Sequence, residues 1–230
     1  ERSTEVSSRR AQCGEAAALT MRLVEGAKWD RIVSGFDAVC QEQLHAFAAL
    51  RWPGVVQEPV LFEQAGRVVG GALMMIQPLP LRLSRIAVSK WAPMLADASA
   101  PDAASIHAGM VEALIAEYAD RRGMLLSVLP RASTDTINGD YVCLRQRGFR
   151  RGSRLLYPNR YLVRLRLSDY AQRKSFHQKW RYHLNKAEKA GLDFEHVGQD
   201  RLDEFKALYA AMIDRKQFPD NSADEALDGL

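Results

Sequence analysis

Apolar runs bounded by turn residues predict a β-sheet in the first part of the chain. Two of these runs lie on either side of Gly66 and have the pattern of a β-hairpin. Another run, MLLSVLP at residues 124–130, is almost continuously apolar, which predicts a buried strand. The predicted strands of this sheet are residues 21–25, 59–64, 67–77, 82–88 and 124–130.

Apolar positions at helical spacing predict helices between and after these strands. The clearest helix is residues 103–122, in which Met110, Leu114 and Tyr118 share a stripe and Gly123 takes the C-cap position. The other predicted helices are one that begins near Trp29, residues 41–51, residues 141–147, one capped by Ser168 or Asp169, residues 179–191 and residues 200–217. Further extended segments are predicted at residues 149–157, 160–167 and 192–197. Because strands and helices alternate, the predicted fold class is α/β or α+β.

Composition is that of a soluble globular protein, since 47% of the 230 residues are hydrophobic and 26% are charged. The longest apolar run, residues 68–76, is far shorter than the roughly 20 residues of a membrane helix. Three widely separated cysteines and five histidines without ligand spacing argue against a disulfide scaffold and a metal site. Residues 1–19 lack periodicity, which predicts a disordered or loosely docked end.

Positive charge is concentrated between residues 145 and 190. This segment contains 14 Lys and Arg residues but only two acids, Asp169 and Glu188, so its net charge is +12 in a chain whose total is +4. Such a division of charge favours a polyanionic partner, which means nucleic acid, phosphates or an anionic membrane surface. The alternative is a solvated helix face with scattered surface arginines.

The most basic helix, KWRYHLNKAEKAG at residues 179–191, has an apolar stripe formed by Trp180, Leu184 and Ala187. At 3.6 residues per turn these three side chains lie together, and we expect them in the core. The polar residues lie on the two remaining sides. Guanidinium groups suit phosphate binding, and lysines add a longer-range field.

A glycine pattern in the hairpin requires a separate interpretation. Residues 67–72, RVVGGA, fit the loop Arg/Gln-x-x-Gly-x-Gly/Ala with which GNAT acetyltransferases hold the pyrophosphate of coenzyme A. That chemistry needs a helix N-terminus behind the loop. Here the pattern runs into LMMIQ, a predicted strand, so we expect Gly70 and Gly71 to permit close packing instead.

The basic helix, with the pattern Lys-x-Arg-x-x-Leu-x-Lys-Ala-Glu-Lys-x-Gly, resembles a helix of the Fem-type (FemABX) aminoacyltransferases, which build the peptide bridges of bacterial peptidoglycan. Gln43, Phe47 and Arg51 resemble the family's Gln-Ser-x-x-Trp-x-x-x-Lys helix. Further similar segments are residues 91–94, 144–149, 157–167 and 215–218, in the same order. The resemblance covers residues 20 to 220, although Asn185 stands where an arginine is usual.

The resemblance implies a GNAT-like acyltransferase fold, with a mixed sheet flanked by helices. It implies a first GNAT-like half at residues 20–160 and the start of a second, truncated half at residues 161–230. The implied reaction moves an aminoacyl group from aminoacyl-tRNA to an amine of a peptidoglycan precursor that has a diphosphate linker. No cofactor is implied. The protein would be cytoplasmic, and peripheral contact with the inner face of the cytoplasmic membrane is compatible with the resemblance.

The resemblance also implies substrate-binding residues. Arg51 and Arg181 would hold the precursor diphosphate, with Asn185 beside them. Lys90 and Asp97 border the strand exit at residues 91–94. The remaining expected substrate-binding residues are Lys186, Lys189 and Arg215. The lysine that stabilises the oxyanion in relatives would lie beyond Leu230, so the catalytic residue is unknown.

Two other functions are compatible with the sequence. One is a GNAT-type N-acyltransferase that uses acyl-CoA or another activated donor on a polysaccharide or lipid. The other is a non-enzymatic RNA-binding module that uses the basic segment, although within the basic helix at residues 179–191 only Trp180 and Tyr182 are available for base stacking.

Overall fold

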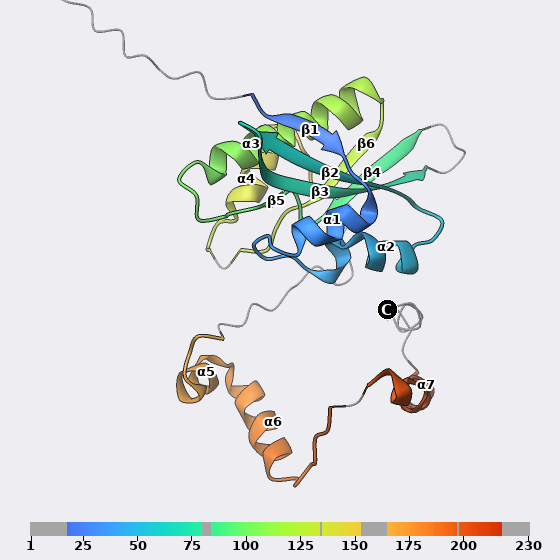
Figure 1. Cartoon of the computed structure of the whole chain (residues 1–230). Helices are drawn as coiled ribbons and strands as arrows, with labels where there is room; N and C mark the ends of the chain where they lie inside the picture. Colours follow the sequence, from blue (N-terminus) through green and yellow to red (C-terminus); the bar gives the residue numbers. More distant parts are fainter. Residues whose placement is uncertain (1–17, 80–83, 134, 153–164, 197, 218–230) are drawn as a thin grey trace, which may run out of the picture. The chain divides into compact units, whose positions relative to one another are not determined.

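A computed structural model of the chain describes residues 18–79, 84–133, 135–152, 165–196 and 198–217 (Figure 1). The chain divides into two compact units, residues 1–152 and 153–230, which are described separately below. The assignment of residues 20–160 and 161–230 to two GNAT-like halves stays a prediction. The expected disordered end falls almost wholly on residues 1–17, which lie outside the described residues.

The first unit is built on a mixed sheet, as predicted. In the described residues the strand order is β1 (Thr20–Leu23), β2 (Val56–Gln64), β3 (Arg67–Pro78), β4 (Arg85–Lys90) and β6 (Leu125–Leu129), and β5 (Met94–Leu95) pairs with β3. Every pair is antiparallel except β4–β6, which is parallel. The β2–β3 hairpin turns at Ala65 and Gly66, both with positive φ, as a tight two-residue turn requires.

Alternating side chains give this sheet two buried faces. Phe62 and Met74 belong to the core on the side of α3 (Ala103–Leu114), which continues into the π-helical η3 (Ile115–Arg121). Leu61 and Leu73 belong to the core on the other side, with residues of α1 (Gly26–Val33) and α2 (His45–Arg51) (Figure 1). This period of two is the expected consequence of strand geometry when helices cover both faces.

Close packing explains the two glycines of the RVVGGA segment. Both lie within β3 and not in a loop before a helix. A Cβ on Gly71 would lie 2.7 Å from the Trp29 ring, and a Cβ on Gly70 would collide with Met110 and the Met94 carbonyl. The prediction that these glycines serve packing is therefore confirmed.

The predicted helix at residues 41–51 is interrupted. It forms a 3₁₀ turn, η1 (Gln41–Gln43), and then α2, with Leu44 extended between them. The Asp30 carboxylate accepts hydrogen bonds from the backbone N–H groups of His45 at 2.6 Å and Ala46 at 3.0 Å, so a side chain from α1 caps α2. Sequence periodicity could not show this long-range cap.

Strand β6 is less buried than its apolar sequence predicted. Leu125 is 55% exposed, whereas Leu126, which points to the other face of the sheet, packs against the core on the side of α3. The helix after it, α4 (Gly139–Gln146), is capped by Asn138, whose side chain accepts a hydrogen bond from the Tyr141 N–H. This element agrees with the prediction of residues 141–147 to within two residues.

The second unit contains α5 (Asp169–Ser175), α6 (Gln178–Glu188), η4 (Gln199–Arg201) and α7 (Leu202–Lys216). The Ser168 hydroxyl caps α5, as one of the two predicted alternatives. The strand predicted at residues 192–197 is wrong for residues 192–196, which are irregular, because no strand among the described residues pairs with them. Most of the extended pair predicted at residues 149–167 lies outside the described residues. None of the helices in the described ranges is long and apolar enough to cross a bilayer.

Candidate functional site

The carboxyl ends of β4 and β6 provide the best-defined polar site in the first unit. These two strands are parallel neighbours, and their pairing ends at Lys90 and Leu129. Residues that follow parallel strands meet at one edge of the sheet, where α/β proteins commonly bind ligands. The segment after β4 is held to the end of β6 by a hydrogen bond of 3.1 Å from the Ala92 N–H to the Leu129 carbonyl.

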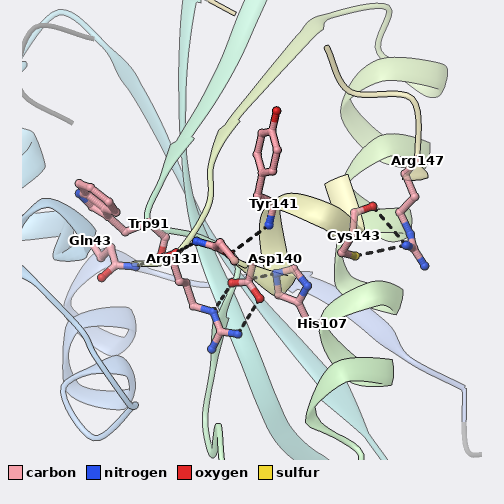
Figure 2. Close-up of polar contacts among 9 residues, drawn as sticks. Gln43, Trp91, His107, Arg131, Asp140, Tyr141, Cys143 and Arg147 are labelled. Carbon is pink, nitrogen blue, oxygen red and sulfur yellow. Dashed lines mark hydrogen bonds and ion pairs between the residues drawn. The ribbon is translucent and has the colours of Figure 1, made fainter. Parts of the chain in front are cut away.

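Gln43 holds the segment that follows β4 in place at this edge of the sheet. Its side chain is 1% exposed, and its amide group donates to the Trp91 carbonyl (Figure 2). The Gln43 side-chain oxygen accepts from the Cys40 N–H at 2.9 Å, and its backbone carbonyl accepts from the Trp29 indole at 2.8 Å. Trp91 has a φ of +54°, a conformation that bulky residues rarely adopt without such support.

Glu42, the neighbour of Gln43, holds the first two residues of the strand exit. One carboxylate oxygen accepts from the Lys90 ammonium at 3.1 Å, and the other accepts from the Trp91 indole at 2.7 Å. Both partners are more than half buried, so bulk water screens the pair only in part.

Two cationic side chains, Lys90 and Arg51, lie near the ring of Trp52. The Lys90 ammonium lies 4.0 Å from the centre of its ring, and the Arg51 guanidinium carbon lies 5.9 Å from it. Both distances are within the range of cation–π interactions. We call Glu42, Arg51, Trp52, Lys90 and Trp91 the Trp52 cluster. It has two cations and one anion beside two indole rings, and this composition suits a phosphate or diphosphate group.

A second polar network joins α3, α4 and the end of β6 (Figure 2). The Arg131 guanidinium binds the Asp140 carboxylate through two bonds of 2.7 and 3.0 Å. His107 is only 3% exposed and its Nε2 lies 3.5 Å from Asp140, but that nitrogen makes no hydrogen bond among the described residues. Burial lowers the pKa of His107 more strongly than Asp140 raises it, so the imidazole is neutral near pH 7.

Cys143 belongs to the edge of that network and is no candidate nucleophile. Arg147 donates to its sulfur at 3.2 Å and to its carbonyl at 3.3 Å. Burial nevertheless raises the pKa of the thiol, so it stays protonated at neutral pH. Among the described residues, no group of three or more His, Cys, Asp or Glu side chains is arranged to hold a metal ion.

In the second unit, two of the expected substrate-binding residues take part in joining α5 to α6. Arg181 donates through Nη1 to the backbone carbonyls of Lys174 at 3.2 Å and Phe176 at 2.5 Å. Asn185 accepts from Arg173 at 2.9 Å, and Arg173 also binds Glu188. The pKa of Glu188 is lowered by its hydrogen bond with Arg173.

The other expected residues are distributed over both units. Arg51 and Lys90 meet at Trp52. Asp97 is exposed and accepts hydrogen bonds from the Ser99 N–H at 2.8 Å and hydroxyl at 2.6 Å, which lower its pKa. Lys186 and Lys189 are exposed on α6 and at its C-cap, and Arg215 is exposed in the last turn of α7. Their roles in substrate binding stay predictions.

The expectation that Trp180 is buried in a core is wrong. Its side chain is 61% exposed, with the Phe176 ring 6.2 Å away between ring centres. The helical spacing of Trp180, Leu184 and Ala187 defines a stripe, but a stripe becomes core only where another element covers it. In the described part of the second unit no residue of α5, α6 or α7 is buried.

Several residues of these sites were not singled out from the sequence. Glu42 and Trp52 stand directly beside the motif residues Gln43 and Arg51, and this adjacency was the available signal. His107, Arg131 and Asp140 come from three separate segments, and nothing in their spacing indicated that they meet.

Comparisons with known proteins bear on the family and on the fold of this chain. Residues 144–224 match the model of the FemAB family. A search of the curated proteins found no match. A crystal structure of FemX is similar over 92% of this chain, with 17% sequence identity and a TM-score of 0.66. This chain covers 55% of the FemX chain, so it spans about half the length of that protein.

Two acetyltransferase structures are similar over a smaller part. One is a ribosomal-protein-alanine N-acetyltransferase from Brucella melitensis biovar Abortus 2308, with 14% identity and a TM-score of 0.40 over 64% of this chain and 99% of that one. The other is a predicted acetyltransferase from Clostridium acetobutylicum, with 14% identity and a TM-score of 0.40 over 62% of this chain and 96% of that one. The FemX match and the mixed sheet confirm the predicted GNAT-like α/β fold. The FemAB resemblance inferred from the motifs is confirmed as well.

Proposed function

We propose that this chain, which carries a FemAB family segment at residues 144–224 on a GNAT-like fold, works as an aminoacyltransferase of the Fem type. Its substrates would be aminoacyl-tRNA and a peptidoglycan precursor that has a diphosphate linker. Following the resemblance, we assign the activity to the cytoplasm. The observation that carries the proposal is the Trp52 cluster, where Lys90 and Arg51 meet at the carboxyl ends of parallel strands.

The proposed reaction is acyl transfer without net redox change. The neutral amine of the precursor attacks the ester carbonyl of the aminoacyl-tRNA, so a C–N bond forms and the C–O bond to the ribose breaks. The proton lost by the amine goes to the ribose oxygen. Such reactions need a positioned amine and stabilisation of a tetrahedral oxyanion.

The residues of this chain contribute binding and orientation to that reaction. Lys90 and Arg51 would hold the diphosphate, and Glu42 would position Lys90 while Gln43 fixes the strand exit. An anchored linker holds the attached peptide amine near the acyl donor, which lowers the entropic part of the barrier. No residue among those described is assigned as the oxyanion stabiliser.

The acyl-CoA alternative is weaker on the evidence of β3. The RVVGGA segment that resembles a coenzyme A loop is paired with β2 and β5. The space beside its two glycines is occupied by the side chains of Trp29 and Met110. The backbone N–H groups there are in no position to form a phosphate loop at a helix N-terminus.

Binding of a soluble nucleotide-linked muramyl-peptide precursor tests the diphosphate site. Lys90→Gln and Arg51→Gln should each weaken binding by roughly tenfold or more, because a hydrogen bond to a charged group contributes about 1.5–3 kcal/mol. Arg67→Gln, an exposed change at the β2–β3 turn, is the matched control and should leave the dissociation constant unchanged.

A transfer assay with the full-length protein tests the reaction itself. It should move a labelled amino acid from a mixture of charged tRNAs to the precursor. Unchanged precursor binding in both the Lys90 and the Arg51 variant would reject the diphosphate site. Transfer from acyl-CoA without any from charged tRNA would reject the reaction.

A further inference from the structure

Helix α6 presents two chemically different sides. The side toward α5 carries Arg181, Asn185 and Glu188, and all three are engaged in hydrogen bonds within the second unit. These contacts leave the single acid of α6 neutralised by Arg173. The basic character of this helix therefore resides on its other side.

That other side carries Lys179, Lys186 and Lys189, with Tyr182 among them. At 100° per residue these four side chains fall within a sector of about 80°. All are exposed, and Tyr182 is 63% exposed. Within the described part of the chain, none of the three ammonium groups lies within 4 Å of a carboxylate. We call this group the lysine face.

The length of the lysine face excludes a single small anion as its ligand. From Lys179 to Lys189 the helix rises about 15 Å, at 1.5 Å per residue. One diphosphate can meet only one or two of these ammonium groups at once. A polyanion with regularly repeated charges, such as the sugar–phosphate backbone of a nucleic acid, can meet all three.

The position of the apolar stripe distinguishes a nucleic acid from a lipid surface. A helix that docks on a bilayer inserts an apolar face that its lysines flank. In α6 the Trp180, Leu184 and Ala187 stripe lies on average about 145° from the middle of the lysine face, so the lysines and the stripe cannot both face one flat surface. Tyr182, the aromatic residue inside the lysine face, is suited to contact a sugar or to stack on a base.

We propose that Lys179, Lys186, Lys189 and Tyr182 form a docking surface for an RNA backbone, which they bind through phosphates without reading base sequence. The inference rests on the proposed function in one respect: the RNA is the aminoacyl-tRNA that donates the acyl group. It assigns the donor to α6 and leaves the diphosphate of the acceptor to the Trp52 cluster.

The test compares a Lys179→Gln, Lys186→Gln, Lys189→Gln triple variant with the unaltered protein. Fluorescence anisotropy with uncharged tRNA and with an unrelated RNA of equal length is measured from about 50 to 200 mM salt. The magnitude of the slope of log K against log salt should fall by about two to three, since each lost phosphate contact removes roughly 0.7–0.9. Both RNAs should bind alike.

A second triple variant controls for the loss of charge alone. Lys28→Gln, Arg67→Gln and Lys216→Gln remove three exposed cations elsewhere and should leave most of the affinity and the slope intact. Far-ultraviolet circular dichroism checks that both triple variants keep their helices. Equal losses in the two triple variants would overturn the assignment, as would a preference for one RNA sequence. Loss of binding to anionic phosphatidylserine vesicles, with RNA binding unchanged, would identify a lipid surface instead.

Failure of this inference can be told apart from failure of the proposed function. If the unaltered protein transfers amino acids and the lysine triple variant has the same KM for charged tRNA, the lysine face is wrong and the function stands. If the triple variant loses RNA affinity but the unaltered protein transfers nothing from charged tRNA, the function is wrong and the RNA surface stands.

Discussion

Replacing Gln43 by Leu tests the support beneath the candidate diphosphate site. Leucine keeps a similar volume but removes the amide, so the Trp91 carbonyl and the Cys40 N–H both lose the hydrogen bond that they make with Gln43. An unsatisfied buried backbone group costs about 1–3 kcal/mol. The more exposed position of Cys40 and the apolar gain of leucine reduce the sum. We therefore expect the free energy of unfolding to fall by about 2–4 kcal/mol.

Urea unfolding followed by tryptophan fluorescence measures this loss. Three of the four tryptophans, Trp29, Trp52 and Trp91, lie in the first unit, so the signal reports mainly on that unit. Gln41→Leu, an exposed change in the same 3₁₀ turn, is the control and should alter stability by less than about 0.5 kcal/mol. A Gln43→Leu effect as small as that of the control would show that Gln43 does not support Trp91.

Two further predictions concern the packing of the sheet and the buried histidine. Gly71→Ala should destabilise the protein by about 1–3 kcal/mol in the same urea assay, because its Cβ would lie 2.7 Å from the Trp29 ring. Gly139→Ala, where nothing lies within 4 Å, should be neutral, and equal effects of the two changes would contradict the packing argument. Because burial lowers the pKa of His107 in the folded state, the unfolded chain binds the proton more readily, and stability should fall as the pH drops below about 6.5. His107→Gln should flatten this fall when unfolding is measured from pH 7.5 to 5, and an unchanged slope would show that His107 has no part in it.

Local sequence signals were sufficient for most elements of the first unit. Gly66 between two apolar runs indicated the hairpin, although the positive φ of Ala65 is not what an alanine by itself favours. The helix C-cap is Arg122, one residue before the predicted position, and Gly123 follows it with a φ of +63°, as is usual for a glycine just after the end of a helix. The interruption at Leu44 was not predictable, because it depends on Asp30 from another helix.

Local patterns failed where burial depended on a distant neighbour. Trp180 has the spacing of a core residue but is largely exposed, and Leu125 lies in an apolar run but is 55% exposed. Residues 192–196 have the composition of a strand, yet a strand needs a hydrogen-bonding partner that the described residues do not supply.

The sequence by itself determined the alternation of strands and helices, the packing role of the two glycines in β3, the concentration of positive charge and the FemAB resemblance. Each of these depends on residues that are neighbours along the chain or repeat at a fixed spacing. Only the tertiary structure decided that Glu42 holds Lys90 over Trp52, that Arg181 donates to the end of α5, and that Arg173 from α5 pairs with the single acid of α6. The physical reason is that an ion pair or a cation–π contact forms between side chains a few ångströms apart in space, and residues 48 positions apart in sequence come that close only after the sheet has formed.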